Sequence, residues 1–486
     1  MLYTKIPDTV VTLWNDVFYI HVFLVRMVFS SVTFLFFFLP IVIIGFLLLP
    51  QKFKKWYLML ASLFFYTWGE GAAIVILLFS ICITYLAAKL AMHNTKKKKV
   101  FLISAIVVNV CVLGVFKYAD FLISSINTAL HISIPLPGIS LPLGISFFTF
   151  QTISYLIDVY RDSKHVEHKF SNFLLYISFF PQLIAGPIVR HSDIADNIDN
   201  PTTTTDDIAI GLQRFIVGLA KKVLIADAMA VVADSLFAMP AGEMSLAITW
   251  IAMIAYGLQI YFDFSGYSDM AIGLGRIAGF TFPENFNYPY TARSIQDFWR
   301  RWHITLSTWI RDYLYIPLGG SRKGEARTYI NLILVFALCG LWHGAAWTFV
   351  VWGAYYGVLQ SIERIPMIKN VLAGLPAIAQ HIYTLLVVFI GWIFFRAETF
   401  AQGFAMTKNL FVPQESGIAL FDVVQPYYMV WMVIAIVLSI PYPRIKKFLS
   451  DDKRMLLRYV GIIVLLLIVI VKVSSQQYSP FIYFRF

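Results

Sequence analysis

The residue best suited to chemistry is His343, which stands in the apolar stretch Leu334–Gly353. This stretch contains no Asp, Glu, Lys or Arg. An ionisable side chain in such surroundings is costly and is therefore a functional candidate by default. Imidazole titrates near neutral pH, so it can take a proton from a hydroxyl and return one to a leaving thiolate. The sequence favours His343 as the general base of an acyl transfer, with a hydrogen-bonded packing histidine as the alternative.

Small residues surround His343. Gly340 and Gly344 form a GxxxG pair, and Ala345 and Ala346 follow it. This spacing lets the backbones of two membrane helices approach each other closely. The same space would also admit a thin substrate, and the sequence leaves both uses open.

A second histidine, His303, lies in the segment Thr291–Gly320. Apolar side chains recur in this segment at steps of three and four residues, and polar side chains fill the positions between them. This pattern predicts one amphipathic helix that lies at the membrane interface. Ser294 and Asp297 have the spacing of a capping box at its start. On spacing alone, His303 is a packing residue at the edge of the apolar stripe.

The same segment is strongly basic, which suits a surface that faces anionic groups. One alternative is that it holds the headgroups of anionic lipids, and the other is that it receives the phosphates of a soluble donor. The residues that we assign to donor binding are Arg300, Arg301, Arg311 and Trp302. The positive charge also predicts that this segment faces the cytoplasm.

Two carboxylates, Asp263 and Asp269, stand in an apolar context within Tyr261–Ile272. Buried carboxylates of this kind are either paired structural groups or parts of a functional site. Together with Gly340 and Gly344, we assign them to the structural and polar core. No metal site is predicted, because the three cysteines form no CxxC pair and no HExxH motif is present.

The elements that position these residues must be membrane helices. Of the 486 residues, 59% are hydrophobic and 13% are charged, whereas a soluble chain has about 25% charged residues. The long apolar runs lack the alternation that is typical of β-barrel strands. The sequence predicts an all-α polytopic membrane protein with interfacial and re-entrant helices and about a dozen membrane helices, at roughly 20 residues for each span.

These helices are predicted to form one integral membrane domain. Its parts are the N-terminal helices (residues 1–145), the core that carries the motifs (146–360) and the C-terminal helices (361–486). Pro181 and Gly186–Pro187 interrupt the apolar segment Ser171–Arg190, which predicts a broken or re-entrant helix. Later spans are predicted at 245–262, 330–341, 345–358, 381–395, 427–440 and 457–471.

Clusters of lysine predict the orientation of the chain. The lysines of Lys52–Lys55 and Lys96–Lys99 are separated by one helical hairpin, so both clusters lie on the same side of the membrane. The positive-inside rule makes this side cytoplasmic and places the basic loop Arg444–Arg454 there too. Both termini are then predicted outside the plasma or inner membrane. Topology thus accounts for the net charge of +11, and no nucleic-acid partner is predicted.

Several segments resemble the membrane-bound O-acyltransferase superfamily (MBOAT), and within it the membrane subunits of alginate O-acetyltransferases. They are DFSGYSDMAIG at Asp263–Gly273, NFNYPY at Asn285–Tyr290, FWRRWHITLSTWIRDYLYIPLGG at Phe298–Gly320 and LWHGAAWTFVVWG at Leu341–Gly353. The resemblance implies transfer of an acyl group, usually acetyl, from a cytoplasmic thioester towards a polysaccharide outside the membrane. It places the essential histidine of the superfamily at His343 and its second histidine at His303.

The resemblance also implies the partners of the reaction. Acetyl-CoA is the expected donor substrate, and no tightly bound cofactor is expected. The acceptor is either an extracytoplasmic polysaccharide or a secreted or anchored protein that relays the acetyl group, and membrane lipid surrounds the enzyme. Three alternatives stay open, namely the D-alanyl transfer subunit of teichoic acid modification, a polysaccharide transporter and a non-catalytic scaffold.

Overall fold

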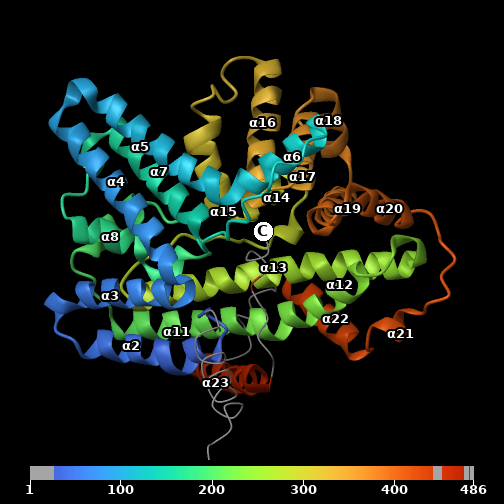
Figure 1. The fold of residues 1–486 in the computed structure, drawn as a ribbon. Coiled ribbons are helices and arrows are strands. Elements are labelled where there is room, and N and C mark those ends of the chain that lie inside the picture. Colours follow the sequence, from blue (N-terminus) through green and yellow to red (C-terminus); the bar gives the residue numbers. More distant parts are fainter. Residues whose placement is uncertain (1–26, 442–450, 476–480, 482–486) are drawn as a thin grey trace, which may run out of the picture.

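The computed structural model describes residues 27–441, 451–475 and 481, and every element in these ranges is helical (Figure 1). The helices before residue 240 are α2 (Leu39–Leu48), α3 (Gln51–Glu70), α4 (Ile74–His93), α5 (Lys98–Leu113), α6 (Ala119–Leu130), α7 (Ile145–Arg161), α8 (Phe170–Ser178), α9 (Phe180–Leu183), α10 (His191–Ile198), α11 (Thr205–Ala220) and α12 (Asp227–Phe237). The later helices are α13 (Leu246–Ile277), α14 (Ile295–Arg301), α15 (Ile304–Ile310), α16 (Glu325–His343), α17 (Trp347–Ile362), α18 (Pro366–Gly374), α19 (Ala377–Arg396), α20 (Phe400–Asn409), α21 (Leu420–Val423), α22 (Tyr427–Leu438) and α23 (Asp451–Ser475). Three π-helical turns, η4 (Gly114–Tyr118), η6 (Lys221–Ala226) and η9 (Arg311–Tyr315), continue α5, α11 and α15.

Six helical segments within the described residues are long and apolar enough to cross a bilayer. They are Gln51–His93, which holds both α3 and α4, Thr95–Leu130, Leu246–Ile277, Glu325–His343, Ala377–Arg396 and Met455–Ser475. Shorter apolar helices occupy Phe34–Leu48 and Tyr427–Leu438. The predicted all-helical membrane architecture is confirmed, whereas the total of about a dozen membrane helices, judged at roughly 20 residues each, stays a prediction.

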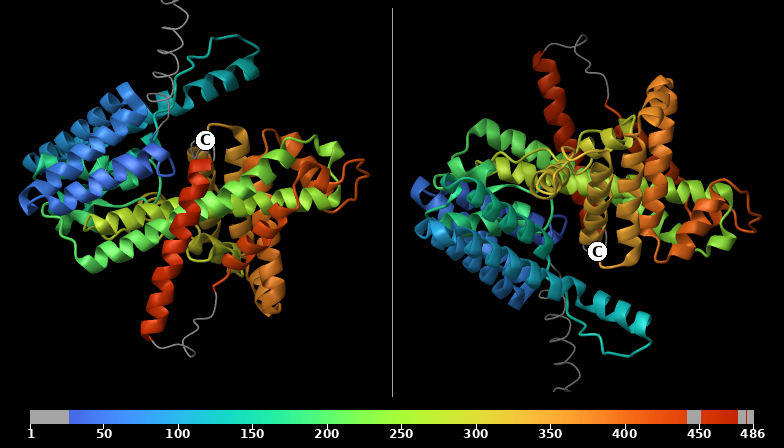
Figure 2. Two further views of the ribbon diagram at one scale, coloured as in Figure 1. Left: turned by 90° about the horizontal axis from the view of Figure 1, so that it is seen from below. Right: turned by 90° about the horizontal axis from the view of Figure 1, so that it is seen from above.

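α13 is the longest described helix and lies at the centre of the molecule, with α11 and α12 alongside it (Figure 1). The sequence predicts a span that ends at residue 262, but the helix continues to Ile277. It continues because cations of α11 and η6 pair with the carboxylates in its second half. α23 crosses the rod formed by α11 and α12 (Figure 2).

α11 and α13 touch at two antiparallel glycine pairs. Gly211 lies against Gly273, and Gly218 lies against Gly266. A Cβ atom added to any of the four would lie 2.5–2.7 Å from the carbonyl oxygen of the partner glycine. Because no side chain tolerates such a distance, only glycine lets these two backbones meet.

Ion pairs mark one end of the N-terminal helices. Lys55 Nζ lies 2.7 Å from Asp199 Oδ1, and the Arg161 guanidinium donates to the backbone carbonyl of Asp312 over 2.6 Å. The first contact ties the start of α3 to the end of α10, the second ties the end of α7 to the π-helical turn η9, and Arg190 at the start of α10 pairs with Asp312 of η9 over 2.8 Å. We call this the basic end of the molecule.

At the opposite end of the same helices, the tip between α3 and α4 carries Glu70, and Asp120 of α6 accepts a hydrogen bond of 3.1 Å from the backbone N–H of Gly138. Glu70 accepts a hydrogen bond of 2.9 Å from the backbone N–H of Leu143, which fixes the loop 131–144 against this tip. We call Glu70 and this loop the loop end. The predicted cytoplasmic side corresponds to the basic end, and the loop Arg444–Arg454 and the N-terminus lie, wholly or for the most part, outside the described residues.

A cysteine pair tests the predicted orientation. In a background without Cys82, Cys111 and Cys339, Ser321→Cys is expected to resist an impermeant thiol reagent in intact cells, because Ser321 follows η9 at the basic end. Ser140→Cys, in the exposed loop 131–144, is expected to react without permeabilisation. Labelling is read on a gel before and after permeabilisation, and the reverse pattern would overturn the orientation derived from positive charge.

The segment predicted to be broken is indeed interrupted. α8 ends at Ser178 and α9 starts at Phe180, with an extended residue between them. Every side chain from residue 172 to 189 is buried. The Ser62 hydroxyl accepts a hydrogen bond of 3.2 Å from the backbone N–H of Phe180, so a neighbouring helix satisfies the backbone at the break, as irregular structure in a membrane requires.

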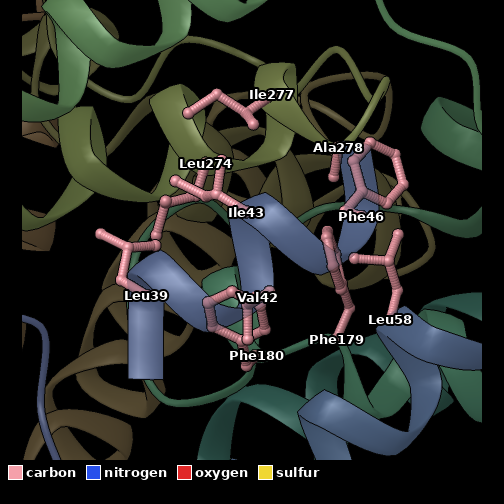
Figure 3. A pocket seen from close by; sticks show the side chains of 10 residues that line it. All are labelled: Leu39, Val42, Ile43, Phe46, Leu58, Phe179, Phe180, Leu274, Ile277 and Ala278. Carbon is pink, nitrogen blue, oxygen red and sulfur yellow. The ribbon is translucent and has the colours of Figure 1, made fainter. Parts of the chain in front are cut away.

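A small cavity of about 20 Å³ lies between α2, α3, α9 and the end of α13 (Figure 3). Its lining side chains are all apolar, among them Phe46, Phe179 and Leu274. An apolar lining offers no group that could move a proton or hold a polar substrate. The site must therefore lie elsewhere, where the histidines are.

Candidate active site

His303 interrupts the amphipathic segment that the sequence predicts as one helix. α14 ends at Arg301 and α15 starts at Ile304, and His303 between them has a left-handed backbone with φ 43°. The continuous helix was a wrong prediction, and the reason is a contact distant in sequence. Asn287 N–H donates to the carbonyl of Arg301 (3.0 Å), and Ile304 N–H donates to the carbonyl of Asn285 (2.9 Å). The backbone groups at the break are thus satisfied without a helix.

The break turns the His303 side chain into the protein, where it is only 1% exposed. Its Nδ1 lies 3.0 Å from Oδ1 of Asn285, which is equally buried. The ring of Phe264 contacts the imidazole edge to face, with centroids 4.6 Å apart. Sequence spacing alone missed Asn285, although the motif NFNYPY that starts with it was a visible signal.

His343 is the last residue of α16 and is 5% exposed. Aromatic rings enclose its imidazole: Trp342, Trp352 and Phe395 have centroids 4.9, 5.3 and 5.5 Å away. The side chain predicted to lie inside the membrane domain is therefore buried in an aromatic cage at a helix end. Such a cage excludes water and keeps the imidazole in one orientation.

Two side chains of the π-helical turn η4 form hydrogen bonds with the carboxyl end of α16, and we call these contacts the grip of η4 on α16. Lys117 Nζ donates to the carbonyl of Trp342 and lies 3.5 Å from that of His343, while Tyr118 Oη donates to the carbonyl of Leu341 over 3.0 Å. A cation at the carboxyl end of a helix also interacts favourably with its dipole. Lys117 was missed from the sequence, although a single lysine after the apolar run 100–116 was a usable signal.

The two histidines lie against the same indole ring. Trp342 has its centroid 6.4 Å from that of His303 and 4.9 Å from that of His343. Trp342 in turn stacks on Phe150, with centroids 5.0 Å apart. The structure therefore brings together the two residues that the sequence singles out from segments 40 positions apart.

A cavity of about 170 Å³ lies at the loop end, close to the carboxyl end of α16. Its lining includes Lys117, Asp120 and Ala345, together with Ile139 and Leu141 of the loop 131–144. Ala345 is two positions from His343. The cavity lies on the side opposite to the basic end, and its lining is apolar apart from Lys117 and Asp120.

The GxxxG pair serves helix packing. A Cβ atom on Gly340 would lie 2.0 Å from the carbonyl oxygen of Phe349 in α17, and one on Gly344 would lie 2.2 Å from the Phe349 ring. The neighbouring helix therefore fills the space that the glycines leave. Of the two uses open from the sequence, close packing of a neighbouring helix is the one found.

The predicted donor-binding residues have different environments. Arg300 is exposed, Arg301 pairs with Asp297 on the same helix (3.0 Å), and Arg311 pairs with the neighbouring Asp312 (2.7 Å). Burial opposes the charge of Asp312, but hydrogen bonds from Arg311 and from a second arginine hold its pKa below the usual value. Donor binding by these arginines stays a prediction.

Trp302 differs from the three arginines because it is 2% exposed. Its indole packs on Phe286, Phe298 and Trp392, with centroids 5.1, 5.5 and 4.8 Å away. The geometry gives Trp302 a packing role in the core beside the site, and its predicted contact with a donor gains no support from this position.

Asp263 and Asp269 are both paired with cations. Lys222 Nζ lies 3.0 Å from Asp263 Oδ1 and 2.6 Å from Asp227 Oδ1. Asp269 pairs with Arg214 of α11 (2.8 Å) and with a lysine of η6. These contacts join α11 and η6 to α13. The arrangement is that of paired structural groups, one of the two alternatives that the sequence leaves open.

Comparison with known proteins identifies the class of protein to which this chain belongs. Residues 112–395 match the model of MBOAT, the membrane-bound O-acyltransferase family, and the chain belongs to this family. It is therefore a multi-pass membrane enzyme that transfers acyl groups.

Proteins of three kinds are similar in sequence to this chain. The "Probable alginate O-acetylase AlgI" of Pseudomonas aeruginosa is 43% identical over 398 residues, 79% of this chain and 75% of that protein. The peptidoglycan O-acetyltransferase of Helicobacter pylori is 39% identical over 79% of this chain and 80% of its own length. The teichoic acid D-alanyltransferase of Bacillus subtilis is 32% identical over 45% of this chain and 58% of its own length.

Proposed function

We propose that this enzyme takes an acetyl group from acetyl-CoA at the cytoplasmic face of the membrane and delivers it to a hydroxyl on the outer side. The acceptor is a cell-surface or secreted polysaccharide, or a serine of a protein that relays the acetyl group to it. The observation that carries the proposal is the position of His343 and His303 against one indole in a buried aromatic cage. Relatives named as O-acetylating enzymes of alginate and peptidoglycan support the polysaccharide.

His343 acts as the general base in this proposal. The imidazole takes the proton of the acceptor hydroxyl, the oxygen forms a bond to the acetyl carbon, and the bond from that carbon to sulfur breaks. The proton then passes to the leaving thiolate, so the imidazole is regenerated. A positioned imidazole can accept a proton and give it back, which suits both halves of this exchange.

The two substrates approach from opposite ends. The basic end offers cations to the phosphates of the donor, and Arg300 of α14 adds an exposed one. The cavity at the loop end offers Lys117 and Asp120 to an acceptor rich in hydroxyls. The acetyl group thus changes sides while the polar parts of both substrates stay in water.

Of the alternatives left open by the sequence, the transporter and the scaffold are set aside because the chain belongs to an acyltransferase family. D-alanyl transfer is the remaining competitor, and a Bacillus subtilis enzyme named for it matches less than half of this chain. The two functions differ in the thioester that is consumed.

Release of thiol by the purified enzyme separates these functions. With acetyl-CoA and a soluble acetyl acceptor such as an oligosaccharide, thiol is expected to appear at a rate that depends on enzyme concentration and is lost in His343→Gln. A D-alanyl thioester on a carrier protein is expected to give no release above background. Release from the carrier thioester together with none from acetyl-CoA would overturn the proposal.

A further inference from the structure

Asn285 makes a set of hydrogen bonds that fixes the direction of its own amide. Its Oδ1 lies 3.3 Å from the backbone N–H of Thr305, 2.8 Å from Oγ1 of Thr305 and 3.0 Å from Nδ1 of His303. Its Nδ2 donates to Oγ of Ser268 over 3.0 Å. A backbone N–H can only donate, so the atom that it faces must be the amide oxygen. The Thr305 hydroxyl also accepts from the backbone N–H of Ile188 (3.0 Å), which leaves its own proton for Asn285.

The direction of this amide decides which nitrogen of His303 carries the proton. An amide oxygen only accepts hydrogen bonds, so Nδ1 of His303 must donate to it. In a neutral imidazole the other nitrogen then has no proton and is an acceptor. No group among the described residues donates to Nε2 of His303, although this atom is buried.

The surroundings keep this imidazole neutral. The elements packed around His303 are α13, which contributes Phe264, and the end of α16, which contributes Trp342 and His343. Burial, with a smaller effect of His343, lowers the pKa of His303 well below its usual value.

Two charged groups on or beside these elements, Asp263 and Lys117, do not reverse this effect. Asp263, which precedes Phe264, is paired with Lys222, and Lys117 binds carbonyls at the end of α16. A carboxylate without a cation would favour the charged imidazolium form of His303. Asp263 is compensated by Lys222 and Lys117 is itself a cation, so neither group has this effect.

We propose that Asn285 is a positioning residue that holds His303 as the Nδ1–H tautomer, so that Nε2 faces the reactants as a hydrogen-bond acceptor. His303 then cannot donate to the thioester carbonyl, and its partner is a hydrogen-bond donor of the substrates. Two groups have this chemistry: the hydroxyl of the acceptor and the amide N–H closest to the sulfur in the donor. This inference rests on the proposed acyl transfer. It adds that, in the hydrogen bond between His303 and a substrate, His303 is the acceptor and the substrate is the donor.

Two substitutions at one position test the inference. Asn285→Leu has a similar shape but removes the oxygen that holds Nδ1–H, and we expect activity to fall about 10–100-fold at every pH, as for partners that orient metal-bound histidines. Asn285→Asp keeps the acceptor and adds a negative charge, which favours the imidazolium. We expect it to stay active at high pH, with the acid limb of the kcat profile moved to higher pH by about 1–3 units.

A matched control separates this role from packing. Asn331 is also buried and its Nδ2 donates to the carbonyl of Gly320 over 3.0 Å, far along α16 from the histidines. Asn331→Leu is expected to keep the wild-type pH profile and most of the activity. Equal losses in Asn285→Leu, Asn285→Asp and Asn331→Leu with unshifted profiles would overturn the inference, as would more than half of the wild-type activity in Asn285→Leu.

Two further measurements complete the test. Thiol release without acceptor, in which water takes the acetyl group and acetate leaves, isolates the donor: a loss there in Asn285→Leu identifies the donor amide as partner, and a loss only in transfer identifies the acceptor hydroxyl. Imidazole ¹⁵N spectra of the labelled protein, compared with His303→Asn, report the tautomer without any reaction. Asparagine suits the left-handed backbone of residue 303. A protonated Nε2 in that difference spectrum would refute the inference even if the proposed function held.

Discussion

Replacing His343 by alanine or by glutamine is expected to lower acyl transfer by about 10²–10⁴-fold, the usual contribution of a general base. Glutamine fills much of the same space but cannot take a proton at neutral pH. Both variants should fold, since one imidazole is lost from a cage in which Trp352 and Phe395 keep their other neighbours. Thiol release in detergent measures the effect.

A second histidine serves as the control for this prediction. His381 of α19 has its Nδ1 3.0 Å from the carbonyl of Ala292 and is half-buried. Because this contact of His381 is structural and lies on α19, away from the aromatic cage of His343, His381→Gln is expected to keep near wild-type activity. If both His343 variants retain more than about a tenth of the activity, a loss smaller than the usual contribution of a general base, His343 is not the base.

Replacing Lys222 by methionine is expected to produce the largest loss of stability. Lys222 is buried between Asp227 and Asp263, so its removal takes away the cation that these two buried carboxylates share. Breaking a buried ion pair by removing one partner typically costs about 3–5 kcal/mol. A fall in the thermal midpoint of the detergent-solubilised enzyme, well beyond that of a surface lysine variant, is the expected measurement.

The matched variant for this prediction is Asp263→Asn. It leaves Lys222 paired with Asp227 over 2.6 Å and therefore removes only one of the two ion pairs of Lys222. Its loss of stability should be clearly smaller than that of Lys222→Met. A loss as large for Asp263→Asn would mean that the specific contact of Asp263, and not the charge balance, holds α13 in place.

Much of the fold was predictable because membrane helices follow from apolar length. The predicted span at 381–395 lies within α19, and that at 427–440 overlaps α22. The predicted end of the span at residue 262 was wrong, because α13 continues to Ile277. A polar stretch looks like the end of a membrane span until the partners of its charged residues are known. The contacts of Asp269 with Arg214 come from another helix, and no local pattern reveals them.

The candidate site was predictable in its reactive residues and not in their supports. His343 stood out because it lies in a stretch without charge. Asn285 and Lys117 act on the histidines through contacts distant in sequence, and the helix break at His303 depends on the backbone of the loop at 285–287. Local periodicity describes a helix without such partners, so it predicted the continuous helix.

The grip of Lys117 and Tyr118 on the end of α16 has a consequence for engineering. Both donors bind main-chain carbonyls of residues 341–343, so the grip does not depend on which side chains those residues carry. The placement of this helix end is therefore separable from the chemistry displayed on it. A library that varies residues 342 and 343 would sample new reactive groups at a fixed location. Changes at Lys117 would instead move the carboxyl end of α16.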